Sequence, residues 1–234
     1  MNAGERLQHY LERFFALRQH GDDSLFLDRL HRLQSFQRQR LMGTHQALLA
    51  DPRLRPGVEF LLDDVYGGRH LLPVAREIRR ALPKAMKLLP DRVMSTSALA
   101  LEAAIITQEL DEALTACLGE RLDTALDEAA YAQAYQTLGR EPERRQQLAL
   151  IAGLGEPLDR YIRSRMLLST FRLVRKPAHA AGFTNLYDFI DKSFRVMKPA
   201  PSVGRLLRQV AADETVILER LFAHHPAPFK DVPQ

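Results

Sequence analysis

The segment Val93-Met-Ser-Thr-Ser-Ala-Leu-Ala-Leu-Glu-Ala-Ala-Ile-Ile-Thr-Gln-Glu-Leu-Asp-Glu-Ala-Leu-Thr-Ala-Cys-Leu118 is the most apolar part of the chain. Over residues 98–106 almost every face of a helix would be apolar, which is typical of a helix surrounded by other helices. We therefore expect the central helix of the fold here, with residues 98–106 among the most buried. Cys117 lies on the same apolar periodicity, and we expect it to be a buried thiol with no disulfide or metal-binding role.

Helical periodicity continues on both sides of this segment. Asp22 and Asp23 are candidate N-caps, and Gly43 and Gly155-Glu-Pro157 are candidate bends or breaks. Alternating β-branched runs and hairpin turns are nearly absent. Together these patterns predict an all-α, single-domain bundle of roughly eight to ten helices. Besides the central one, we expect helices over residues 7–17, 23–49, 58–66, 71–89, 122–138, 141–154, 157–174, 184–197 and 202–222.

Length and composition favour one globular domain. The chain has 234 residues, 46% of them apolar and 26% charged, and it contains no evident linker. We assign residues 1–225 to the domain and expect residues 226–234 to form a loose, proline-rich tail. The sequence contains no signal-peptide pattern and no transmembrane segment, so we expect a cytoplasmic location.

The octapeptide Phe60-Leu-Leu-Asp-Asp-Val-Tyr-Gly67 places two adjacent carboxylates among apolar residues. Because neighbouring residues on a helix point about 100° apart, at most one of Asp63 and Asp64 faces the core squarely. A carboxylate inside a protein must be paired, protonated or bound to a metal. We expect an Arg from another helix to hold Asp64 in a structural role, and the alternative is a functional site.

This octapeptide resembles the signature of an uncharacterised bacterial family named for its Phe-Phe-Leu-Glu-Glu-Leu-Tyr motif. Phe60, Leu62, Tyr66 and Gly67 match that signature, whereas two Asp replace its two Glu. Weaker matches extend through Leu110-Asp111, residues 131–135, residues 144–146 and residues 181–183. The resemblance implies a helical protein and supplies no activity.

Carboxylates on several of the expected helices suggest one candidate buried polar site, consisting of Asp63, Asp64, Tyr66, Glu102, Glu109 and Asp111. Helical bundles build carboxylate-bridged metal sites from such residues, but they add a Glu-x-x-His spacing that this chain does not contain. We therefore expect no bound metal and no cofactor. The lone Asp123-Thr-Ala-Leu-Asp127 is expected to lie on a solvated acidic face, and the sequence contains no nucleophile motif.

The C-terminal third is rich in Arg and Lys, although the net charge of the whole chain is only +4. A basic patch of this kind binds an acidic protein or another anionic surface. It could instead pair with the acidic segment 102–128 or be an ordinary solvated face. Specific nucleic-acid binding is not expected, because the chain has no Trp and its other aromatic residues fall at core-like positions. The candidate basic surface consists of Arg160, Arg163, Arg172, Arg175, Lys176, Arg195 and Lys198.

Two functions from different classes follow from these candidates. The preferred one is a non-enzymatic interaction or regulatory protein that presents the basic surface to a partner. The alternative is a helical enzyme or ligand-binding protein with a buried polar or carboxylate-metal site near Asp64.

Overall fold

The computed structural model describes residues 2–17, 23–66 and 71–230, and over these residues the protein is a single all-α domain without strands. Twelve α-helices account for most of it, two or more above the expected number. A π-helix, Leu61–Val65, and a 3₁₀-helix, Gly119–Asp123, complete the list. The α-helices are α1 Ala3–Ala16, α2 Ser24–Thr44, α3 Gln46–Ala50, α4 Arg55–Phe60, α5 Leu71–Leu88, α6 Asp91–Leu118, α7 Glu128–Leu138, α8 Glu141–Arg163, α9 Arg165–Leu173, α10 Arg175–Ala180, α11 Thr184–Met197 and α12 Val203–Phe222.

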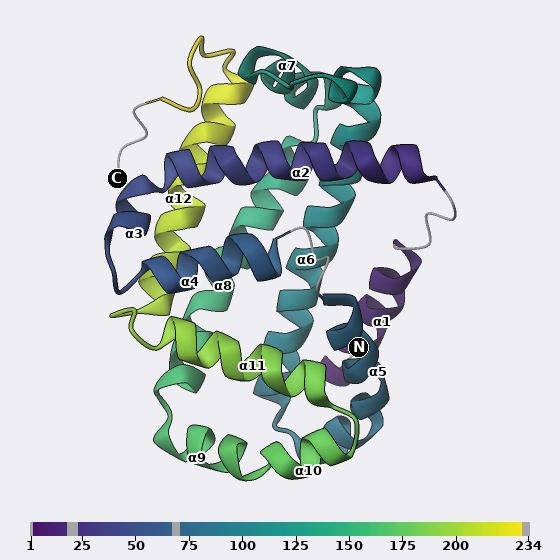
Figure 1. Cartoon of the computed structure of the whole chain (residues 1–234), viewed down its shortest axis with the longest axis vertical. Coiled ribbons are helices and arrows are strands. Elements are labelled where there is room, and N and C mark those ends of the chain that lie inside the picture. Colours follow the sequence, from purple (N-terminus) through teal and green to yellow (C-terminus); the bar gives the residue numbers. More distant parts are fainter. Residues whose placement is uncertain (1, 18–22, 67–70, 231–234) are drawn as a thin grey trace.

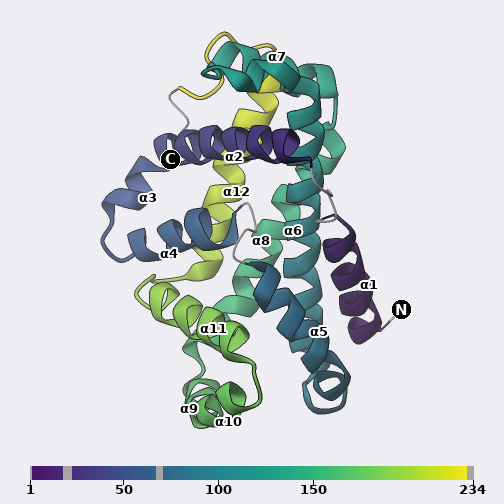
Figure 2. The same cartoon turned by 45° about the vertical axis from the view of Figure 1, so that its right-hand side comes forward.

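Three long helices, α6, α8 and α12, run along the long axis of the molecule (Figure 1). Helix α2 crosses them near the end that carries α7, and α1 and α5 lie beside α6 (Figures 1 and 2). The short helices α9 and α10 lie across the opposite end. The expected central helix is therefore confirmed as α6, which touches α1, α2, α7 and α8.

Three hydrophobic clusters fill the spaces around these helices. One joins α1 and α5 to the first half of α6, one joins α2 and α7 to its second half, and the third lies between α4, α8, α11 and α12. Within residues 98–106, Ala98 and Ile105 are buried as expected, whereas Ala100 is exposed. The prediction of a buried Cys117 is wrong, because Leu114 and Leu118 occupy the inward face and Cys117 is exposed.

Local capping explains several helix ends. Asp23 accepts a hydrogen bond from the backbone N–H of Phe26 and begins α2, as expected. The expected helix over residues 122–138 is shorter in the structure. The Asp127 carboxylate accepts a hydrogen bond from the backbone N–H of Ala130, so Asp127 is the N-cap and α7 begins at Glu128. The other candidate cap, Asp22, and Gly67 of the octapeptide lie outside the described residues.

The expected break at Pro157 is absent, and α8 continues through it to Arg163. Tertiary contacts hold the helix here. The Asp159 carboxylate accepts hydrogen bonds from Ser202 Oγ at 2.6 Å, Val203 N at 3.0 Å and Gly204 N at 3.3 Å, and so caps the first turn of α12. The carboxylate is thereby fixed two residues beyond the proline.

Gly155 lets α8 and α12 approach to backbone contact. A Cβ added at Gly155 would lie 2.7 Å from Cα of Gly204, whereas one added at Gly153 would meet only Leu99 Cδ2, at 3.7 Å. We expect Gly155→Ala to lower the free energy of unfolding by about 1–3 kcal/mol despite the better helix propensity of Ala. Gly153→Ala should raise it by about 0.5–1 kcal/mol. Urea denaturation of both variants checks the pair, and equal effects would contradict the close crossing.

Candidate functional site

The octapeptide with the two carboxylates forms the end of α4 and the π-helix that follows it. The backbone N–H of Tyr66 donates to the carbonyl of Leu61 at 2.9 Å, which closes a turn one residue wider than an α-helical turn. π-helices are rare and occur frequently at functional sites. Here the wider turn sends Asp63, Asp64 and Tyr66 to three different partners.

Asp63 and Asp64 form ion pairs near the surface. Asp63 accepts a hydrogen bond of 2.6 Å from Nε of Arg38, and both side chains are exposed. Asp64 accepts hydrogen bonds of 2.6 and 2.7 Å from Nζ of Lys192 on α11. The prediction that an Arg holds Asp64 is therefore wrong, although the cation does come from another helix. Because Lys192 Nζ reaches both oxygens of a half-buried carboxylate, this pair satisfies Asp64 without a metal.

Tyr66 turns inward and donates a hydrogen bond of 3.2 Å to Oδ2 of Asp111. Asp111 lies in the second half of α6 and is 1% exposed. Two amides of α2 also donate to it, Gln37 at 2.9 Å and Gln34 at 3.3 Å. Burial raises the pKa of Asp111, and the nearby charge of Arg144 and these three donors oppose that rise only in part.

Tyr131 and Arg144 complete this network. The Tyr131 hydroxyl donates a hydrogen bond of 3.0 Å to Oε1 of Gln37, and burial raises the pKa of the phenol. Arg144 is 5% exposed and lies over the Tyr135 ring at 4.7 Å. Every group around Asp111 is thus a neutral donor or a buried cation. Because the carboxylate is enclosed, the network stabilises the junction of α2, α6 and the π-helix and gives a substrate no access to Asp111.

The other two predicted site residues lie elsewhere. Glu109 accepts a hydrogen bond of 3.0 Å from Nε of Arg13, and Glu102 lies 3.6 Å from Nη2 of Arg6. Of the six candidates, only Tyr66 and Asp111 come together. In the described part of the chain, no group of three or more His, Cys, Asp or Glu side chains could hold a metal ion. The amides of Gln34 and Gln37 were missed, although they share the inward face of α2 with Leu30 and Leu33.

A second buried polar cluster joins the end of α2 to α12. Nη1 of Arg40 donates to both oxygens of Glu214 at 2.5 and 2.6 Å. His45 is 2% exposed, and its ring nitrogens lie 3.3 Å from Glu214 and 3.4 Å from Asp213 without hydrogen-bonding geometry. Burial opposes ionisation of Glu214, but the charge and hydrogen bonds of Arg40, together with His45, outweigh it and lower the pKa of this carboxyl below its ordinary value.

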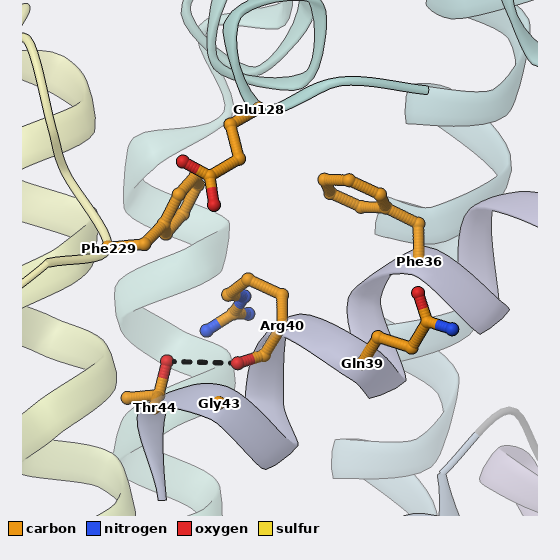
Figure 3. Close-up of a pocket in the computed structure, with 7 residues that line it drawn as sticks. All are labelled: Phe36, Gln39, Arg40, Gly43, Thr44, Glu128 and Phe229. Atoms are coloured by element: carbon orange, nitrogen blue, oxygen red, sulfur yellow. Dashed lines mark hydrogen bonds between the residues drawn. The ribbon is translucent and has the colours of Figure 1, made fainter. Parts of the chain in front are cut away.

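Next to this cluster is a pocket of about 400 Å³. Figure 3 shows the rings of Phe36 and Phe229 on opposite sides of it, with Arg40 between them and Glu128 above. Phe229 belongs to the expected loose tail, yet it packs against Tyr131 at 5.9 Å between ring centres. A small molecule would fit the pocket, but its buried cation is already paired with Glu214. Residues 231–234 of the tail lie outside the described residues.

All seven residues of the candidate basic surface are exposed, and six of them form no ion pair with a described residue. The exception is Arg163, which donates to Asp159 at 3.1 Å and to the carbonyls of Ala200 and Pro201 at 2.7 Å. Three carboxylates of the acidic segment 102–128 pair with cations outside this surface, and among the described residues the segment forms no ion pair with the surface. Its ion pairs run from Glu102, Glu109 and Asp123 to Arg6, Arg13 and Arg29.

The family model described as Domain of unknown function (DUF8198) matches residues 16–228. The chain belongs to this family. The DUF8198 match includes the π-helix, the Asp111 network and the whole candidate basic surface. Among curated proteins and among solved structures, no match was found.

The DUF8198 domain also exposes apolar side chains beside these cations, which sequence reasoning missed. Six of the seven large apolar residues that are exposed in the described chain fall in the two segments 86–89 and 166–174. The start of α6, just after the first segment, is tied to the end of α8, because the Tyr161 hydroxyl donates to the carbonyl of Arg92 at 3.0 Å. Both segments therefore lie at the end that carries α9 and α10 (Figures 1 and 2). We call residues 84–92 and 160–176 together the basic end.

None of the helices described for the DUF8198 domain has the length and apolar character needed to cross a membrane. Helices α9 and α10 contain no fully buried residue, so they cover the end of the domain without contributing to its core.

Proposed function

We propose that this protein is a non-enzymatic interaction protein that binds an anionic partner through the basic end. One observation carries the proposal. Arg160, Arg172, Arg175 and Lys176 are exposed, and no described carboxylate pairs with them. Unneutralised cations on one face create a positive potential that attracts and orients an anionic partner.

The buried polar groups support a binding role over an enzymatic one. Asp111 and Tyr131 have raised pKa values, but each is 1% exposed and bonded to neighbouring side chains. A general acid or base must reach the proton that it transfers. We also propose a cytoplasmic location and a bacterial origin, the latter from the resemblance of residues 60–67 to the Phe-Phe-Leu-Glu-Glu-Leu-Tyr signature.

Charge reversal tests the proposed function. We expect the double variant Arg172→Glu with Arg175→Glu to elute from immobilised polyglutamate at clearly lower salt than the wild type. The matched control is Arg76→Glu with Arg121→Glu, which changes the net charge equally at exposed cations outside the basic end. Because screened attraction acts over roughly 10 Å at 0.1 M salt, the position of the charges matters as well as their number. Equal elution of the two double variants would contradict the proposal.

A further inference from the structure

The basic end combines unpaired cations with protruding apolar side chains, and we infer that its partner is the surface of an anionic phospholipid bilayer. This inference rests on the proposed function and names the partner. The apolar side chains enter the boundary between headgroups and acyl chains, while the cations contact lipid phosphates.

The apolar residues are too concentrated to be ordinary surface exposure. Leu88 and Leu173 are each 79% exposed and Met166 is 72% exposed, so these side chains stand almost free of the protein. Single exposed apolar residues scattered over a surface need no explanation, but a group gathered at one end of a molecule indicates a binding surface. Here Leu25, on α2, is the one large exposed apolar residue of the described chain that lies elsewhere.

The orientation of the helices suits a planar partner. Helices α9 and α10 lie across the end of the elongated molecule, roughly perpendicular to α6 and α8 (Figure 1). Phe171 anchors α9 by stacking on the buried Tyr187, with ring centres 4.3 Å apart and rings nearly parallel. Met166 and Leu173 are left exposed on the same helix. An amphipathic helix held in this way lies in the plane of a membrane interface without crossing it.

The charges around the apolar residues favour lipid headgroups. Residues 84–92 of the basic end contain Leu88 together with Lys84, Lys87 and Arg92. Residues 160–176 contain Met166 and Leu173 together with Arg165, Arg172 and Arg175. None of these six cations forms an ion pair with a described residue. Asp91 is the one carboxylate of the basic end. Each Lys or Arg near an anionic membrane strengthens binding roughly five-fold.

A bilayer fits these features better than an acidic protein does. The exposed Leu side chains come from two separate segments and stand apart, so a folded partner would need matching pockets for each. A lipid surface accepts protruding side chains wherever they stand, and its phosphates neutralise the surrounding cations. The rest of the molecule then remains in water, since the basic end is one tip of its long axis (Figures 1 and 2).

Co-sedimentation of the full chain with vesicles tests the inference. We expect binding to phosphatidylcholine vesicles containing about 30% phosphatidylglycerol and little binding to phosphatidylcholine alone. Leu88→Ser with Leu173→Ser should weaken binding to the anionic vesicles by at least about ten-fold, because two apolar side chains no longer enter the lipid. Leu25→Ser is the matched control and should bind as the wild type does. All three replaced side chains are exposed, and thermal unfolding verifies that each variant folds.

The outcomes separate the inference from the proposed function. Retention on polyglutamate that depends on Arg172 and Arg175, without binding to anionic vesicles, would overturn the lipid inference and leave the proposed function standing. Vesicle binding that is unchanged in Leu88→Ser with Leu173→Ser would also overturn it, because the apolar residues would then play no part. If the wild type binds neither anionic vesicles nor immobilised polyglutamate, the proposed function is contradicted as well.

Discussion

Arg40→Leu is expected to lower the free energy of unfolding by about 3–5 kcal/mol, because it leaves a charge buried without its partner. Glu214 is 12% exposed in its side chain and depends on Arg40 for its bidentate pair. Asp213, next to it in sequence, is 3% exposed and brings a second carboxylate close to the same site. Chemical denaturation at neutral pH measures the loss.

The double variant Arg40→Leu with Glu214→Leu removes both charges and should recover most of the lost stability, since apolar residues often replace a buried pair at little cost. Arg53→Leu removes an ion pair in which the Arg side chain is 64% exposed, and it should change stability by less than about 1 kcal/mol. A loss below about 1 kcal/mol in Arg40→Leu itself would show that Glu214 finds another partner or water.

The effect of Arg40→Leu should also depend on pH. In the wild type the folded state lowers the pKa of Glu214 from an ordinary value of 4.5, so this group stabilises the fold above that pH. The stabilisation is lost as the pH falls through the lower pKa of the folded state. In the variant, burial acts without Arg40 and raises the pKa of Glu214, so protonation relieves the buried charge. The difference between wild type and variant should therefore be smaller near pH 4 than at pH 7.

The second large effect is expected for Ile105→Ala, at about 2–5 kcal/mol of unfolding free energy. Ile105 is 1% exposed and belongs to the cluster that joins α6 to Leu11 and Phe14 of α1 and to Leu82 of α5. A cavity at this place would face rigid helices on two sides, so the surroundings collapse little.

Two further variants bracket this result. Ile105→Val should cost only about 0.5–1.5 kcal/mol, because it removes one methylene. Leu88→Ala removes a larger group from a side chain that is 79% exposed and should leave stability within about 0.5 kcal/mol of the wild type. An Ile105→Ala loss similar to that of Leu88→Ala would contradict the central position of α6.

Local signals in the sequence predicted most of the helices. They failed where contacts between residues far apart in the sequence determine whether a helix continues. The apolar periodicity of residues 93–118 and the cap at Asp23 act within one helix, and both predicted what the structure contains. Pro157 weakens a helix locally, but Asp159 and Gly155 contact the start of α12 and keep α8 continuous. Those contacts join residues more than 40 positions apart, and no local pattern reports them.

The candidate site shows the same division. The motif and the carboxylate of Asp111 were both noticed, and the bond from Tyr66 to Asp111 joins them across 45 positions. Gln34 and Gln37 could have been found, because polar residues spaced three apart on an otherwise apolar helix face indicate buried partners. The exposed apolar residues beside the basic surface could not have been found from the sequence. Leu88 belongs to α5, and only the fold brings it to the same end of the molecule as Leu173.

The π-helix at Leu61–Val65 makes the register of this segment sensitive to chain length. A π turn holds one residue more than an α turn, so removing one residue from Leu61–Val65 would let the chain close an ordinary helical turn. The residue that follows would then rotate by about 100° around the helix axis. Tyr66 would leave the Asp111 carboxylate, with Gln34 and Gln37 as its remaining side-chain donors. A relative of this chain with a one-residue gap at this point would therefore need a different residue to supply the third hydrogen bond in its core, whereas relatives without the gap can keep the tyrosine.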